Sequence, residues 1–151
     1  MKVLAIGAHP DDIEIYMFGL LSACVDRKDK VILAIATDGA AGTVKTNRNL
    51  IEIRKKEAMR GLSSIGTPDF LALPDGELSY FSNAGIIIGN YISKINPDLI
   101  ITHSPEDYHP DHKALSDLVV QAIGFKCPVL FSDTLMGVNF LPEYYIDITK
   151  Y

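Results

Sequence analysis

The chain has 151 residues, of which 48% are hydrophobic and 22% charged, and its formal net charge is −5 at pH 7. This length and composition suit one globular domain, over residues 1–151, with a sizeable core. The acidic balance disfavours nucleic acid or an anionic membrane as a partner, and no apolar run approaches the ~20 residues of a membrane-spanning helix.

Apolar strands alternate with amphipathic helices along the chain. Strands are predicted at residues 3–6, 31–37, 70–73, 99–102 and 129–131, with a sixth candidate at 145–148. Helices are predicted at residues 13–26, 49–65, 83–95 and 112–123. This alternation is typical of a parallel sheet with helices on both faces, so we expect a Rossmann-like, three-layer α/β/α fold. In the strand order 3-2-1-4-5, the first and fourth strands are neighbours where the order reverses.

All four histidines follow two of these strands. The segment His9-Pro10-Asp11-Asp12 comes directly after the first strand, and the segment from His103 to His112 comes directly after the fourth. Ligands of open α/β sheets bind outside the carboxyl ends of the strands. We therefore expect these two segments to form one site.

The residue types in the two segments indicate a metal-assisted reaction. Imidazoles and carboxylates are ligands of zinc and of ferrous iron, and a catalytic site leaves one coordination position open. His9, Asp12 and His112 can supply three ligands. A metal held there lowers the pKa of its water toward ~7.

The remaining polar residues of the two segments suit proton transfer. Asp11 can act as general base beside the metal ligand Asp12. His109 can stabilise an oxyanion or protonate a leaving group, with Asp107 or Asp111 orienting it and raising its pKa. Taken singly, the paired aspartates are equally typical of a helix cap, and only the joint placement favours a site.

Three other features have ordinary structural interpretations. The charged run around Arg54 is typical of a solvated helix face, and the glycine-rich segment 38–43 suits a turn or a substrate-lining loop. Cys24 and Cys127 form no CxxC pair, so we expect free thiols and a reducing, cytoplasmic setting.

Several stretches resemble the LmbE-like or PIG-L-like metal-dependent N-deacetylases. The resemblance covers essentially the whole chain and is carried by residues 8–14, 37–39 with 42–43, 53–58, 74–76 and 107–112. It implies a zinc hydrolase, with Fe²⁺ or another divalent metal as the alternative. The implied reaction removes the acetyl group from an N-acetylglucosamine-type conjugate, a small-molecule amino sugar.

The resemblance also implies a role for each matching residue. The metal ligands look like His9, Asp12 and His112; the catalytic residues like Asp11, His109 and Asp111; and the substrate contacts like Arg54, Asp75 and Asp107.

The chain departs from the family pattern in two places. Residues 15–18 are bulky where the family usually has small residues and glycines, and the chain ends sooner than family members usually do. An incomplete substrate pocket is the basis of the alternative function, a non-catalytic metal- or sugar-binding domain. Apolar surface left uncovered at the short end would favour a homo-oligomer.

Overall fold

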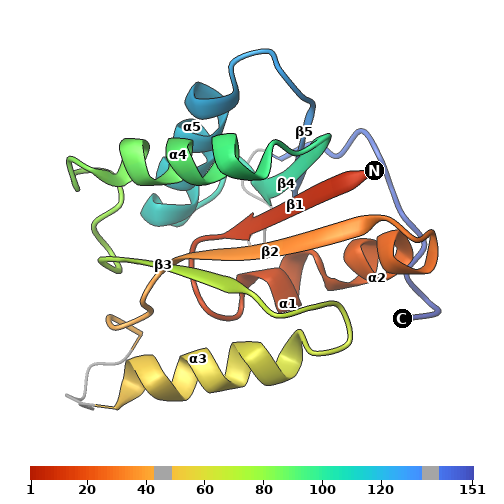
Figure 1. Cartoon of the computed structure of the whole chain (residues 1–151), viewed down its shortest axis with the longest axis horizontal. Helices are drawn as coiled ribbons and strands as arrows, with labels where there is room; N and C mark the ends of the chain where they lie inside the picture. Colours follow the sequence, from red (N-terminus) through yellow and green to blue (C-terminus); the bar gives the residue numbers. More distant parts are fainter. Residues whose placement is uncertain (43–48, 134–139) are drawn as a thin grey trace.

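The computed structural model describes residues 1–42, 49–133 and 140–151, so Thr43 of the glycine-rich segment lies outside the described part. These residues form a five-stranded parallel sheet with the order β3-β2-β1-β4-β5 (Figure 1), which confirms the predicted topology. The strands are β1 (Lys2–Gly7), β2 (Lys30–Thr37), β3 (Asp69–Leu73), β4 (Leu99–His103) and β5 (Val129–Ser132).

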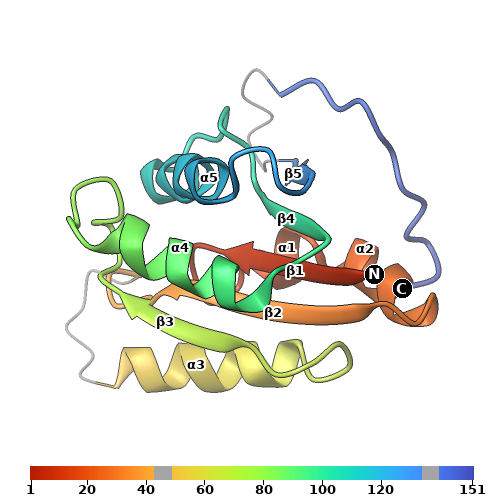
Figure 2. The ribbon, with the colours of Figure 1, turned by 45° about the horizontal axis from the view of Figure 1, so that its top comes forward.

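Helices cover both faces of the sheet, as the three-layer prediction requires (Figure 2). The helices are α1 (Asp12–Tyr16), α2 (Phe18–Asp26), α3 (Leu50–Gly61), α4 (Ala84–Ile95) and α5 (Pro110–Ile123). Alternate residues of β1 enter two separate cores: Leu4 packs with α4 and α5, whereas Val3 packs with α1, α2 and α3. Both cores are apolar because every central strand is buried on both faces.

The expected single helix over residues 13–26 is instead two helices. Met17 interrupts it with φ −127° and ψ −14°. The short α1 packs against β1, whereas α2 packs against β2. The prediction of one helix is wrong because the two halves cover different strands.

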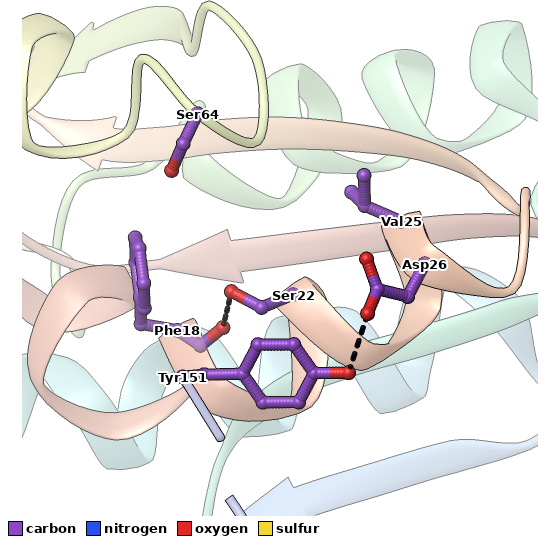
Figure 3. Close-up of a pocket in the computed structure, with 6 residues that line it drawn as sticks. All are labelled: Phe18, Ser22, Val25, Asp26, Ser64 and Tyr151. Carbon is purple, nitrogen blue, oxygen red and sulfur yellow. Dashed lines mark hydrogen bonds between the residues drawn. The ribbon is translucent and has the colours of Figure 1, made fainter.

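The expected sixth strand at residues 145–148 is absent from the described structure. This segment runs past α2 instead, where Ile148 packs so closely that a Cβ on Gly19 would lie 2.5 Å from its Cγ2. The Tyr151 hydroxyl donates to Asp26, at the edge of a shallow pocket on α2 (Figure 3). Contacts with α2 therefore replace the predicted pairing with the sheet.

Two further expectations concern single features of the sequence. Cys24 and Cys127 are both free, as predicted. Within the described residues, no helix combines the length and the apolar character needed to cross a membrane.

Candidate active site

The two histidine-bearing segments meet at the carboxyl ends of β1 and β4, which are paired neighbours in the sheet. His9 and Asp12 come from the turn after β1 and the start of α1, and His112 comes from the first turn of α5. All three side chains are buried. The reversal point of the strand order thus brings the predicted ligands together.

These three residues form a compact triangle, in which Asp12 presents a different oxygen to each imidazole. The His9 Nδ1 lies 3.3 Å from the Asp12 Oδ2, and the His112 Nε2 lies 3.3 Å from the Asp12 Oδ1. The two imidazole nitrogens are also 3.3 Å apart. Donors bound at ~2.0–2.2 Å around a tetrahedral zinc ion are separated by about 3.3 Å. The spacing and the donor set therefore both fit a divalent metal.

Each imidazole of the triangle contacts at least one carboxylate through its other ring nitrogen. The Asp107 Oδ2 lies 2.9 Å from the His112 Nδ1, and the Asp75 Oδ1 and Asp111 Oδ2 lie 3.1 and 3.2 Å from the His9 Nε2. A proton donated to such a carboxylate leaves the opposite ring nitrogen with a free lone pair. These contacts leave the His9 Nδ1 and the His112 Nε2 facing the Asp12 carboxylate.

Neighbouring carboxylates favour protons on the imidazoles of His9 and His112, and a bound metal would take the place of those protons. Burial opposes a proton on His9, yet hydrogen bonds and charges from Asp12 and Asp75 raise the pKa of His9 to about 10. Burial likewise opposes a proton on His112, and Asp12 and Asp107 raise the pKa of that ring. Burial would raise the pKa of Asp12, but bonds from His103, His112 and His9 lower it well below its usual value. Metal binding at such a site releases protons.

Asp111 does not orient His109 through its carboxylate, which corrects one expectation. The Asp111 Oδ2 accepts from the backbone N–H of Gly76 at 2.7 Å, and its Oδ1 accepts from Leu78. The His109 Nδ1 instead accepts the backbone N–H of Asp111 at 3.2 Å. This bond leaves the proton of a neutral His109 ring on Nε2. Asp111 instead contacts His9 and the segment that follows β3, at Gly76 and Leu78.

The expected rise in the pKa of His109 is also wrong. Burial and the neighbouring rings of His9 and His112 lower it, and they outweigh the charge of Asp111. This direction favours the neutral ring over the protonated ring that the sequence led us to expect.

Asp107, expected to contact substrate, is 1% exposed. Its Oδ2 faces His112, and its Oδ1 accepts from the backbone N–H of His109 at 2.9 Å. Both oxygens are thus engaged inside the protein, and the substrate-contact prediction is corrected to a positioning role.

Arg54 is not a solvated charge. Its side chain is 16% exposed. The Nη1 donates to the Gly39 carbonyl at 3.2 Å, and the Nη2 donates to the Pro10 carbonyl at 3.1 Å. The Nη2 also lies 3.1 Å from the Asp11 Oδ2. A Cβ on Gly42 would lie 2.6 Å from the Nη1, so this glycine leaves room for the guanidinium. Arg54 therefore joins α3 to the loops that follow β1 and β2.

Asp11 faces the pocket while its neighbour Asp12 faces the histidines. Asp11 has φ 148°, a conformation that is costly for a residue with a Cβ. This backbone turns the two adjacent carboxylates in different directions. Burial raises the pKa of Asp11, and the guanidinium of Arg54 opposes the rise.

The site opens into a pocket of about 390 Å³. Its lining includes the polar residues Asp11, Arg54 and Asp75 and the bulkier side chains of Ile15, Tyr16 and Tyr108. Of the bulky residues 15–18, Ile15 and Tyr16 thus line the pocket, whereas Met17 is buried and Phe18 lines the separate pocket on α2.

His103 is a member of the site to which the sequence reasoning assigned no role. Its Nε2 lies 3.0 Å from the Asp12 Oδ2, and its ring stacks on His112. The sequence feature that could have pointed to His103 is its position at the end of the strand β4, which leads into the site.

Comparison with known proteins places these features in a family. Residues 4–123 match the family model PIG-L, described as GlcNAc-PI de-N-acetylase. The diacetylchitobiose deacetylase of Thermococcus kodakarensis is 28% identical over 170 aligned positions, covering 98% of this chain and 64% of that protein. A probable N-acetyl-alpha-D-glucosaminyl L-malate deacetylase 2 of Bacillus cereus is 34% identical over 133 positions, covering 80% of this chain and 60% of that protein.

A solved structure agrees with the fold. The N,N'-diacetylchitobiose deacetylase from Pyrococcus horikoshii, complexed with its inhibitor MPG, superposes with a TM-score of 0.84 at 26% identity. The match covers 99% of this chain and 64% of that one. The chain thus spans less than two thirds of the length of these relatives.

Proposed function

The chain belongs to the GlcNAc-PI de-N-acetylase family, and from this membership we propose that it is a metal-dependent N-deacetylase. The proposed reaction hydrolyses the acetyl amide of an N-acetylglucosamine-type conjugate. The observation that carries this proposal is the triangle of His9, Asp12 and His112, with donor atoms 3.3 Å apart. The names of the relatives, deacetylases of diacetylchitobiose and of a glucosaminyl malate, support the substrate class.

Zinc is the proposed metal, and Fe²⁺ or another divalent ion also fits two imidazoles and a carboxylate. Held by His9, Asp12 and His112, the metal would supply Lewis acidity, which lowers the pKa of water and polarises the acyl carbonyl. Asp75, Asp107 and Asp111 hold the two imidazoles in the tautomers that this binding requires.

Asp11 is the proposed general base. Its carboxylate lines the pocket, and Arg54 holds one oxygen at 3.1 Å. Asp11 accepts a proton from the attacking water as the new C–O bond forms. It then returns this proton to the nitrogen as the C–N bond breaks, so the products are acetate and a free amine.

His109 is the proposed oxyanion donor. Its Nδ1 is occupied by the Asp111 backbone N–H, so the Nε2–H is the group free to donate. A neutral donor aimed at the carbonyl oxygen stabilises the negative charge that develops when water attacks.

The wall of Ile15, Tyr16 and Tyr108 suits the apolar face of a sugar ring. Tyr108 is 43% exposed, and its ring lies edge-on to His109 with the centroids 6.3 Å apart. Asp11 and Arg54 also line this pocket, whereas the two Asp75 oxygens already face the His9 Nε2 and the Ala41 backbone N–H. A pocket with an apolar wall and a few polar groups is typical of small-molecule sites.

Turnover of N-acetylglucosaminides by the zinc-loaded protein tests the proposal. We expect acetate and free amine in equal amounts, with no release from the chelator-treated protein. A fully metal-loaded protein that binds the sugar without releasing acetate would contradict it and support the alternative of a non-catalytic binding domain.

A further inference from the structure

His103 is a buried histidine that contacts two residues of the candidate metal site, Asp12 and His112. It is the last residue of β4, and it is 1% exposed. Its ring lies almost parallel to that of His112, with 3.7 Å between centroids and 11° between planes. Its Nε2 lies 3.0 Å from the Asp12 Oδ2 and 3.0 Å from the backbone nitrogen of Ala8. This nitrogen therefore faces one acceptor and one donor at the same distance.

One nitrogen cannot satisfy both neighbours, because it carries either a proton or a lone pair. A proton on Nε2 makes a charge-assisted bond to Asp12, roughly twice as strong as a neutral bond from Ala8. A proton on Nδ1 would set the Nε2 lone pair against the carboxylate. Each state leaves one buried N–H without an acceptor: the ring Nδ1–H, which has no hydrogen-bond partner among the described residues, or the Ala8 backbone N–H, which donates to Nε2 at 3.0 Å. The contact with the carboxylate therefore decides between the two states. The ring protonated on Nε2 is therefore favoured, and the hydrogen bond from the Ala8 backbone N–H is the one that is lost.

From this geometry we propose that His103 is a positioning residue that holds Asp12 for metal binding through a bond from its Nε2–H to the Asp12 Oδ2. The same oxygen accepts the backbone N–H of His9 at 2.7 Å. Two donors thus fix Oδ2, and the carboxylate keeps its Oδ1 toward His112. A nitrogen that carries a proton cannot ligate, so this bond keeps the His103 Nε2 from the metal, although Asp12, His103 and His112 together lie close enough to hold an ion.

This inference rests on the metal site of the proposed function but not on the reaction. Partners of metal ligands typically contribute about 10–100-fold to metal affinity. The loss of the His103 bond should therefore be measurable with the metal alone, without any substrate.

Two amide substitutions separate the bond from the ring. The Nε2 of a glutamine can occupy the place of the imidazole Nε2, whereas an asparagine is one methylene too short to reach Asp12. We expect His103→Gln to bind Zn²⁺ within about threefold of the parent protein, and His103→Asn to bind it about 10–100-fold more weakly. Affinity is read by chelator competition, and Co²⁺ absorption reports the ligand geometry. Thermal melting of both metal-free variants verifies that they are folded.

Equal affinities of the two variants would overturn the proposal. If both bind as the parent does, Asp12 does not need His103. If both lose the metal equally, the ring itself ligates or supports His112 by stacking. A chain that shows the expected difference yet hydrolyses no amide would contradict the deacetylase proposal alone.

Discussion

Replacing Arg54 with alanine is expected to destabilise the protein, contrary to what a solvated helix face would predict. The guanidinium donates to the carbonyls of Gly39 and Pro10 at 3.2 and 3.1 Å from a side chain that is 16% exposed. Hydrogen bonds to a charged group contribute roughly 1.5–3 kcal/mol each, and these are long and partly solvated, so the low end applies. The Asp11 ion pair adds about 0–1 kcal/mol, because the Asp11 carboxylate is largely exposed.

The expected loss is therefore about 3–4 kcal/mol, or about 6–16 °C in melting temperature for a domain of this size. Calorimetry or melting followed by circular dichroism measures it. Lys56→Ala is the matched control, since Lys56 is exposed on the same helix and should change stability by less than about 0.5 kcal/mol. If Arg54→Ala melts together with the control while substrate use declines, Arg54 only contacts substrate, and the account of its two carbonyl bonds is wrong.

Three further predictions concern the metal and the reaction. The protein should bind about one divalent ion per chain, and His9→Ala and His112→Ala should each lose it in elemental analysis, because three ligands make the site; full occupancy in both variants would refute the ligand assignment. Asp11→Asn should keep the metal but lose about 10²–10⁴-fold in turnover, because an amide cannot accept the proton; near-normal turnover would exclude Asp11 as the base. Asp107→Asn should weaken zinc binding by about 10–100-fold in chelator competition, because it leaves no carboxylate on the His112 Nδ1. An unchanged affinity would show that this bond does not orient the ring.

The strand order is the part of the fold that the sequence determined most completely. Apolar runs of strand length alternate with helical patterns, and parallel strands joined by helices have few allowed arrangements. Since ligands bind at the carboxyl ends of strands, the chain positions of His9 and His112 were enough to predict that they meet. Only local patterns and a general rule of connection were needed.

The partner of each side chain was decided by tertiary structure. Asp107 and Asp111 are four residues apart in sequence, yet one contacts His112 and the other contacts His9 and the turn at Gly76. Arg54 belongs to a charged run that looks solvated, but it reaches two loops that are distant in sequence. No local pattern encodes such contacts, because each depends on where another segment of the chain comes to rest.

The last described segment shows the same contrast between a local sequence pattern and the contacts made in the folded chain. The apolar pattern of residues 145–148 suits a strand, yet Tyr145 is 84% exposed and Ile148 packs on α2 at Gly19. The sequence by itself determined the parallel sheet, its strand order and the meeting of the histidines, because these follow from local periodicity and chain connection. Packing between distant segments decided the break at Met17, the course of this last segment and the orientation of every site side chain, since these depend on contacts that form only in the folded chain.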